Sequence, residues 1–270
     1  MNQFAALDLH ISIAAEEVFK IGGISVTNAM ITGFVGLLIT FAILFYVGGR
    51  VKRGHYNRFV GLVQWVFEGL LNSINDVVPD KKLARKITPL AVTIFFFVLI
   101  NYWLSVIPGL DSIKLFGVPI IRSLTADLNF TLGLAIITVV TVQVYAIKHL
   151  GVFGNAGRYF RNPIKDPIGA FEGVLELIGE VSRGTALALR LFGNAFAGEV
   201  LLLVIAVLTN YFASVTLPFF MAFELFIGFI QAYVFFILTL IFTSLAVAGH
   251  SEAAHDHSPT PRSKVVKKVE

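Results

Sequence analysis

Five long apolar runs without a single charged residue constrain the fold of this chain most strongly. Each run holds about 20–25 residues, and an α-helix of that length crosses the ~30 Å hydrocarbon core of a bilayer. The strict alternation of a membrane β-barrel is absent. The runs are 29–49, 87–110, 128–147, 200–223 and 225–249. With 56% hydrophobic and only 14% charged residues, the chain is predicted to be an all-α integral membrane protein with about five membrane-embedded helices.

Basic residues gather in alternate connecting segments, and this pattern predicts an orientation. Segments 50–58, 80–86 and 148–165 and the tail 251–270 are rich in Lys and Arg, whereas loop 109–127 is not. Cytoplasmic segments of membrane proteins carry the excess of basic residues. We therefore expect the N-terminus outside and the C-terminus in the cytoplasm.

Two amphipathic stretches are expected to lie at the membrane surface rather than to cross it. Residues 59–78 must stay on one side if five spans are to give the predicted orientation. Residues 167–182 place Glu172, Glu176 and Glu180 at intervals of four, which puts them on one helical stripe. A solvated face is the simplest interpretation of that stripe.

The predicted organisation is a single membrane domain of residues 1–250 followed by a disordered basic tail, 251–270. The last two spans are longer than the others, so they are expected to be tilted. An uncharged turn near Asn210–Ala213 joins them into an antiparallel hairpin. The predicted spans are 29–49, 87–110, 127–147, 184–209 and 214–249.

The stretch ALALRLFGNAFAGE, residues 186–199, places charged and amide side chains inside a span. On a helix, Asn194 lies roughly 40° from Arg190, and small residues lie within about 60° of it. These small residues are Ala186, Gly193 and Ala197. A small-residue face lets another helix approach closely in lipid. Glu199 lies at roughly 180°, so it cannot neutralise Arg190.

The predicted hairpin places further polar residues at matching depths. Arg190 pairs in depth with Gln231, and Glu199 pairs with Glu224, which predicts two polar layers. Two carboxylates at one depth in a low-dielectric region resist simultaneous ionisation. Such a pair can take up a proton from outside and pass it on, whereas Arg190 keeps its proton and acts as a fixed charge.

Structural alternatives remain open for several of these residues. Arg190 could extend its side chain to the interface, and Asn194 and Gln231 could serve only as hydrogen bonds between helices. Glu199 and Glu224 could likewise be structural. No nucleophile–base arrangement is present, so neither a catalytic site, a metal nor a cofactor is expected.

Asp127 and Asn129 stand at the outer end of the third span and are further candidates for an ion path. For Asp127 the alternative is an ordinary N-cap of the following helix.

Four motifs together resemble subunit a of F-type ATP synthase in its bacterial form. They are LALRLFGN, the GE that follows it, FIQAYVF (229–235) and TADLNFTL (125–132). The resemblance implies a proton-translocating stator subunit in the bacterial plasma (inner) membrane. Its implied partners are the c-ring, the peripheral-stalk b subunits and the lipid bilayer, and no nucleic acid is expected.

The resemblance also implies roles for individual residues. Arg190 matches the stator charge that faces the c-ring carboxylates. Asn194, Glu199, Glu224 and Gln231 match the lining of the outer half-channel. Glu176 and Arg183 resemble positions of the cytoplasmic half-channel.

The chain departs from the family pattern at two places. Many members pair a carboxylate with a histidine where this chain has Glu199 and Glu224, so the pH dependence of the relay is in question. Many members have Asn and Gly where this chain has Tyr102 and Ser105, a change expected to affect helix packing only.

Two other functions remain open from the sequence: a self-contained transporter or channel, and a purely structural scaffold. A transporter would need its own substrate cavity, usually with broken helices and internal repeats. No internal repeat is evident in the sequence, and its buried polar residues cluster on one hairpin instead.

Overall fold

The computed structural model describes residues 15–21, 24–107, 114–115, 118–119, 122–159 and 167–248. Within these residues the chain is almost entirely helical, which confirms the predicted fold class. Five of the helices are long and apolar enough to cross a membrane, and α2 is not among them. The helices are α1 (Asn28–Lys52), α2 (Arg58–Val77), α3 (Lys81–Val106), α4 (Leu128–Tyr159), α5 (Pro167–Thr209) and α6 (Ala213–Ala248).

Two small antiparallel hairpins accompany the helices, and the sequence did not predict them. Strands β1 (Glu17–Ile21) and β2 (Ile24–Thr27) pair just before α1, and β3 (Lys114–Leu115) pairs with β4 (Val118–Pro119) between α3 and α4. Both lie at the ends of membrane-length helices and leave the helical architecture unchanged.

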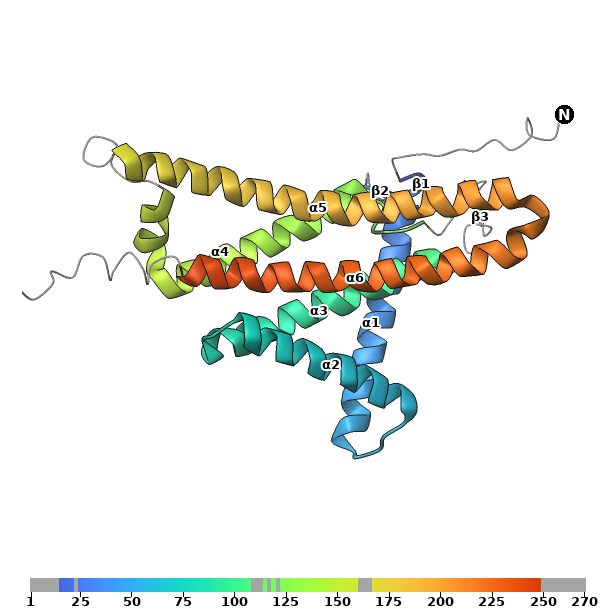
Figure 1. Cartoon of the computed structure of the whole chain (residues 1–270), viewed down its shortest axis with the longest axis horizontal. Coiled ribbons are helices and arrows are strands. Elements are labelled where there is room, and N and C mark those ends of the chain that lie inside the picture. The colour runs from blue at the N-terminus through green and yellow to red at the C-terminus, as the bar shows by residue number, and fades with distance from the viewer. Residues whose placement is uncertain are drawn as a thin grey trace, which may run out of the picture.

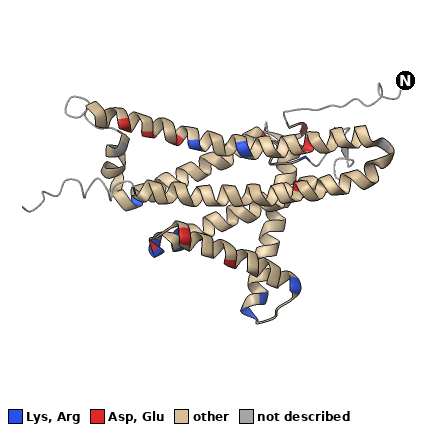
Figure 2. Cartoon of the chain, viewed as in Figure 1, with Lys and Arg blue, Asp and Glu red and all other residues tan. Residues whose placement is uncertain are grey.

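Helices α5 and α6 form the predicted antiparallel hairpin and run side by side along the long axis of the molecule (Figure 1). A short 3₁₀ turn, Asn210–Phe212, joins them where the uncharged turn was expected. Helix α4 packs against both, α3 packs against α6, and α1 packs against α3. The charged side chains are sparse along the two long helices, and most of their length carries none (Figure 2).

Helix α5 corrects one predicted boundary. Residues 167–182 and 184–209 were expected as two elements, but α5 is continuous over 43 residues. Helix-favouring Ala, Leu and Glu residues occupy this region, and no proline interrupts it after Pro167. The buried Gly184 allows close packing, because a Cβ there would meet Val139 of α4 at 3.0 Å. At about 65 Å, the helix is twice as long as the hydrocarbon core is thick, so it must tilt or extend beyond it.

Helix α4 is interrupted near its C-terminal end. Gly151 has φ 76° and ψ 163°, a conformation that side chains with a Cβ strongly disfavour. The segment that follows therefore leaves the axis of α4 and turns back toward the start of α5 (Figure 1). This change of direction brings Asn155 and Tyr159 close to Gln143, earlier on the same helix.

Helix α2 covers part of the other helices with a single apolar stripe. Its buried residues are Val60, Val63, Leu70 and Ile74, at helical spacing. They pack against α3 and α6. The amphipathic pattern predicted for 59–78 thus corresponds to a real helix of closely matching bounds.

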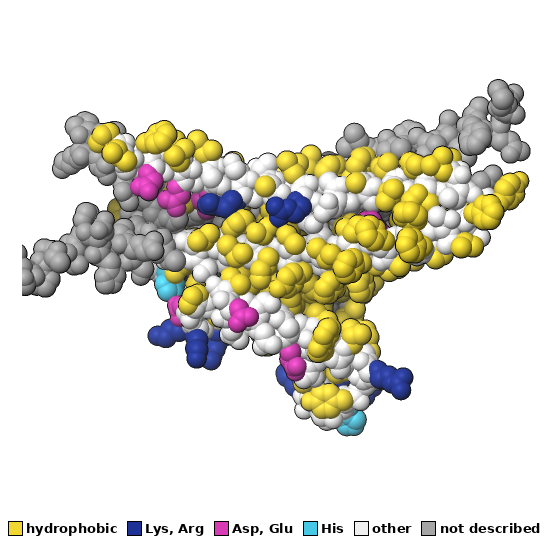
Figure 3. Space-filling model, in the orientation of Figure 1, with side chains coloured by type: hydrophobic (Ala, Val, Ile, Leu, Met, Phe, Trp, Pro, Cys, Tyr) yellow, Lys and Arg dark blue, Asp and Glu magenta, His cyan; other side chains and the backbone are white. Residues whose placement is uncertain are grey.

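Large aromatic residues fill the centre of the helix packing. Phe95, Phe235 and Phe236 are fully buried, and Phe95 makes edge-to-face contacts with Phe229 and Phe236. Much of the outer surface is apolar as well, and hydrophobic side chains cover wide areas of the face in Figure 3. An apolar surface of this extent suits contact with lipid.

Candidate functional site

Arg190 lies on an open face of α5. Ala186, Gly193 and Ala197 on the same face are exposed, and a Cβ built on Gly193 would meet nothing within 4 Å. Arg190 itself is exposed and makes no hydrogen bond or ion pair with any residue that the structure describes. Basic side chains on α5 are visible at the surface in Figure 3. A guanidinium group within an apolar span is costly without a partner, so this face is suited to an anionic group from another chain.

Asn194 and Gln231 connect α5 with α6 one helical turn beyond Arg190. The Asn194 Nδ2 atom donates to Gln231 Oε1 over 2.7 Å. Gln231 is 2% exposed, and its Nε2 has no hydrogen-bond partner among the described residues. Gln231 was predicted to share a layer with Arg190, but the hydrogen bond of Gln231 goes to Asn194.

Glu224 of α6 is buried against α5. It is only 4% exposed, and its carboxylate lies directly on the backbone of Gly198, where any added Cβ would collide with it. Glu199 follows Gly198 on α5, so the structure places both carboxylates at one level of the hairpin, as the depth argument predicts. Glycine is required at 198 by this close approach rather than by its backbone angle.

Tyr102 of α3 completes this cluster, whereas the sequence led us to expect that it affects helix packing only. Its hydroxyl donates to Glu224 Oε1 over 2.6 Å, and the residue is 1% exposed. Its ring lies against the backbone of Gly228, and Glu199 is near enough to interact with it electrostatically. A buried tyrosine usually hydrogen-bonds through its hydroxyl. That rule was the available signal, but it did not say which residue would accept.

The N-terminal half of α5 borders a small cavity toward α4 and α6. Its volume is about 260 Å³, and its polar lining consists of Glu176, Glu180 and Arg183. The Arg183 guanidinium lies over the Phe242 ring at 5.7 Å from the centroid. The structure therefore places Glu176 and Arg183, both predicted for the inner path, around one hollow.

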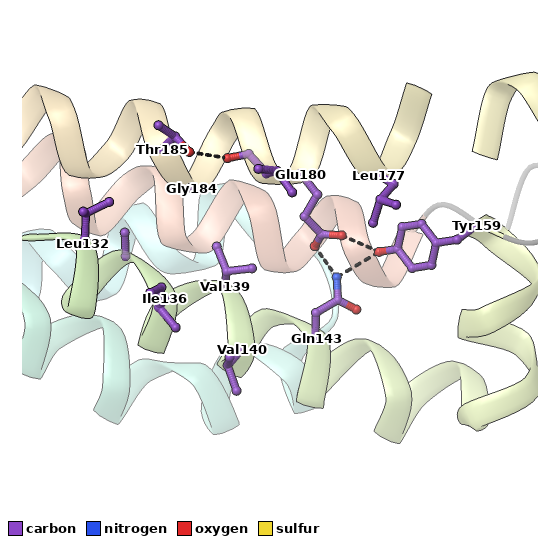
Figure 4. A pocket seen from close by; sticks show the side chains of 12 residues that line it. Leu132, Ile136, Val139, Val140, Gln143, Tyr159, Leu177, Glu180, Gly184 and Thr185 are labelled. Atoms are coloured by element: carbon purple, nitrogen blue, oxygen red, sulfur yellow. Dashed lines mark hydrogen bonds between the residues drawn. The ribbon is translucent and has the colours of Figure 1, made fainter. Parts of the chain in front are cut away.

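Glu180 is a second residue that sequence reasoning left out of the site. The stripe containing it was interpreted as a solvated face, but Glu180 is partly buried and hydrogen-bonded by Gln143 and Tyr159 of α4. It also lines a larger cavity of about 400 Å³ between α4 and α5 (Figure 4). Nothing in the sequence indicated that α4 would turn back and deliver Tyr159 to this carboxylate.

Asp127 and Asn129 occupy the start of α4. Asp127 Oδ1 accepts from the backbone N–H of Asn129 over 2.9 Å, which is the hydrogen bond of an N-cap. Asp127 is buried, and Asn129 is exposed. The described residues contain no group of three His, Cys, Asp or Glu side chains arranged to hold a metal ion.

Comparison with known proteins decides the family. A family model described as ATP synthase A chain matches residues 30–244. The chain belongs to this family. It is 31% identical over 230 residues to ATP synthase subunit a of Mycobacterium bovis, covering 84% of this chain and 89% of that protein. It is 35% identical over 222 residues to the subunit a of Desulforamulus reducens, covering 79% and 78%.

The agreement extends across distant bacteria. Identity to subunit a of Acinetobacter baumannii is 28% over 260 residues, or 87% of this chain and 88% of that protein. Together with the five membrane-length helices, membership of the ATP synthase A chain family makes this a multi-pass inner-membrane component of the Fo sector.

Proposed function

We propose that this member of the ATP synthase A chain family is the stator through which protons pass, and that Arg190 faces the carboxylates of the c-ring. The observation that carries the proposal is the open small-residue face of α5 around an unpaired Arg190. A carboxylate on a neighbouring helix can approach such a face closely. Arg190 cannot release its proton, so it holds the ionised carboxylate and blocks direct passage of a cation.

The outer half-channel is formed by the cluster between α3, α5 and α6. A proton arriving from outside meets the Glu199 and Glu224 level first and then the Asn194–Gln231 pair, before it reaches a c-ring carboxylate. Asp127 and Asn129 lie toward the outer entrance of this half-channel. Asp127 can cap α4 and still lie beside the proton path. Once neutralised, the c-ring carboxyl group can rotate into lipid.

The inner half-channel opens around Glu176 and Arg183. After nearly a full turn, the c-ring carboxyl group loses its proton there to the cytoplasm, and Arg190 again holds the resulting anion. A potential of 100 mV supplies about 2.3 kcal/mol for each charge moved across the membrane, so several protons are needed for each ATP.

The proposal also includes the orientation of the chain in the membrane and its partners. The N-terminus lies outside, the C-terminus is cytoplasmic, and α2 lies along the cytoplasmic interface. The c-ring contacts the open face of α5, and peripheral-stalk b subunits hold the chain against rotation. ATP chemistry takes place elsewhere in the complex, so this chain carries no catalytic site of its own.

Replacement of Arg190 by alanine tests the proposal. In membrane vesicles that contain the assembled complex, Arg190→Ala should abolish ATP-driven proton pumping, because the c-ring anion loses its counter-charge. Arg58→Ala, at the exposed start of α2, is the matched control and should pump normally. Unchanged pumping by Arg190→Ala would instead support a purely structural scaffold.

A further inference from the structure

Glu180 lies on the wall between two cavities, at the flank of the open face of α5. It lines both the 260 Å³ hollow that contains Glu176 and Arg183 and the 400 Å³ cavity between α4 and α5 (Figure 4). It precedes Arg190 by ten residues, which is roughly 15 Å along the helix axis and about 80° around it. Along that axis it stands between Arg190 and Glu176.

Each oxygen of the Glu180 carboxylate is held by a different donor from α4. The Tyr159 hydroxyl donates to Oε2 over 2.5 Å, and Gln143 Nε2 donates to Oε1. Gln143 Nε2 also donates to the Tyr159 hydroxyl over 2.9 Å, which closes a triangle (Figure 4). Asn155 Nδ2 donates to Gln143 Oε1 over 3.0 Å. This last bond orients the Gln143 amide so that its N–H groups face the carboxylate.

The network orients the carboxylate without using up its capacity to take a proton. An ionised carboxylate offers about four lone-pair sites, and the two donors from α4 occupy only part of them. Both donors are neutral, and no described Lys or Arg forms an ion pair with Glu180. The negative charge is thus positioned by hydrogen bonds rather than cancelled by a cation.

Few other titratable groups surround Glu180 within the described structure. Glu176 and Arg183 of α5 share the smaller cavity with it, and Tyr159 comes from α4. The side chains that α6 contributes to this cavity are apolar: Phe242, Leu245 and Ala246.

We propose that Glu180 is the inner carboxylate that receives the proton from the c-ring, and that Tyr159 and Gln143 are its positioning residues. This inference rests on the proposed function. The proton leaves the carboxylic acid of the c-ring and binds a free lone pair of the Glu180 carboxylate. The c-ring carboxylate remains ionised and pairs with Arg190. Glu180 then gives the proton to water in the hollow around Glu176 and becomes a carboxylate again.

The test uses the complete complex in inverted membrane vesicles and compares matched pairs of variants. Glu180→Gln is compared with Glu172→Gln, an exposed residue on the same stripe. Tyr159→Phe is compared with Tyr145→Phe, another α4 tyrosine, whose hydroxyl donates to the Lys86 carbonyl instead. ATP hydrolysis by the vesicles reports whether each complex has assembled.

Glu180→Gln should slow ATP-driven proton pumping at least about tenfold, since a positioned proton-transfer group contributes ~10²–10⁴ to the step it serves. Tyr159→Phe should displace the pH of half-maximal pumping by about one unit, the equivalent of one lost hydrogen bond to a charged group. Both controls should behave as the unmodified complex does.

Normal pumping by Glu180→Gln would overturn the inference. An unchanged pH profile in Tyr159→Phe would overturn the positioning role, and this variant decides the matter if Glu180→Gln fails to assemble. The two proposals can be rejected separately. Loss of pumping in Arg190→Ala with normal pumping in Glu180→Gln would reject only the role of Glu180. Normal pumping in Arg190→Ala would reject the stator function itself.

Discussion

At the scale of single residues, the Glu224 cluster includes a tyrosine, Tyr102, that the sequence would assign to helix packing alone. Tyr102 and Glu224 are separated by 122 positions in the sequence, yet they share a 2.6 Å hydrogen bond in a buried setting. A hydrogen bond to a charged group is worth about 1.5–3 kcal/mol. The phenol therefore holds Oε1 of Glu224 in place against the backbone of Gly198 of α5.

Removing that hydroxyl tests its contribution. Tyr102→Phe keeps the ring against Gly228 but removes the donor, so the Glu224 carboxylate should lose its fixed orientation. We expect proton pumping to fall about tenfold, the lower limit of that bond energy, while the complex still assembles. Tyr145→Phe is again the matched control in a vesicle pumping assay. Equal pumping by the two variants would leave Tyr102 a packing residue only.

At the scale of elements, the break in α4 makes the inner site possible. Gly151 has a positive φ, and the segment after it brings Tyr159 next to Glu180. A continuous α4 would place Tyr159 about 24 Å from Gln143 along the helix axis, because sixteen residues separate them. One backbone angle thus determines whether two helices share a polar network.

Gly151→Ala tests the role of this break. A residue with a Cβ in this region of backbone space costs about 1–3 kcal/mol, so the terminal segment should straighten or loosen. The expected result is the same displaced pH profile of pumping as in Tyr159→Phe. Gly157→Ala, at a position where a Cβ meets nothing within 4 Å, should leave the profile as it is. Identical profiles for both glycine variants would contradict the argument.

At the scale of the whole molecule, the polar residues of the α5–α6 hairpin form two groups, the Glu224 cluster and the residues around Glu180, and Arg190 lies between them on the open face of α5. Neither the 400 Å³ cavity nor the 260 Å³ hollow is lined by a residue of the Glu224 cluster. The proposed function therefore assigns the connection between the two groups to the c-ring carboxylate, which moves from one to the other.

Reconstitution tests whether the chain conducts protons without the c-ring. The purified chain alone in liposomes should conduct no more protons than empty liposomes when a potential is applied. Liposomes that also contain the c-ring and the b subunits should conduct through the assembled Fo sector. Conduction by the chain alone would favour the self-contained channel instead.

The extent to which the sequence predicted this structure depended on the range of each interaction. Run length predicted the spans, and hairpin symmetry placed Glu199 and Glu224 at one level, because helical rise is regular. Tyr102 and Glu180 escaped prediction because their partners come from other helices, across 122 and 37 residues. The continuity of α5 was not predicted, because its amphipathic N-terminal part and its apolar C-terminal part differ in hydropathy. Both parts nevertheless have the same helical propensity.

That continuity has a mechanical consequence. Glu180, Arg190 and Glu199 all project from one unbroken rod, so the separation between the two carboxylates, roughly 28 Å along the axis, cannot change without bending a helix. In the proposed function, α5 thereby holds the two carboxylates at a fixed distance as well as carrying the stator charge. In that function the whole of α5 bears the lateral load of the turning c-ring, and the proposed proton entrance and exit keep their spacing.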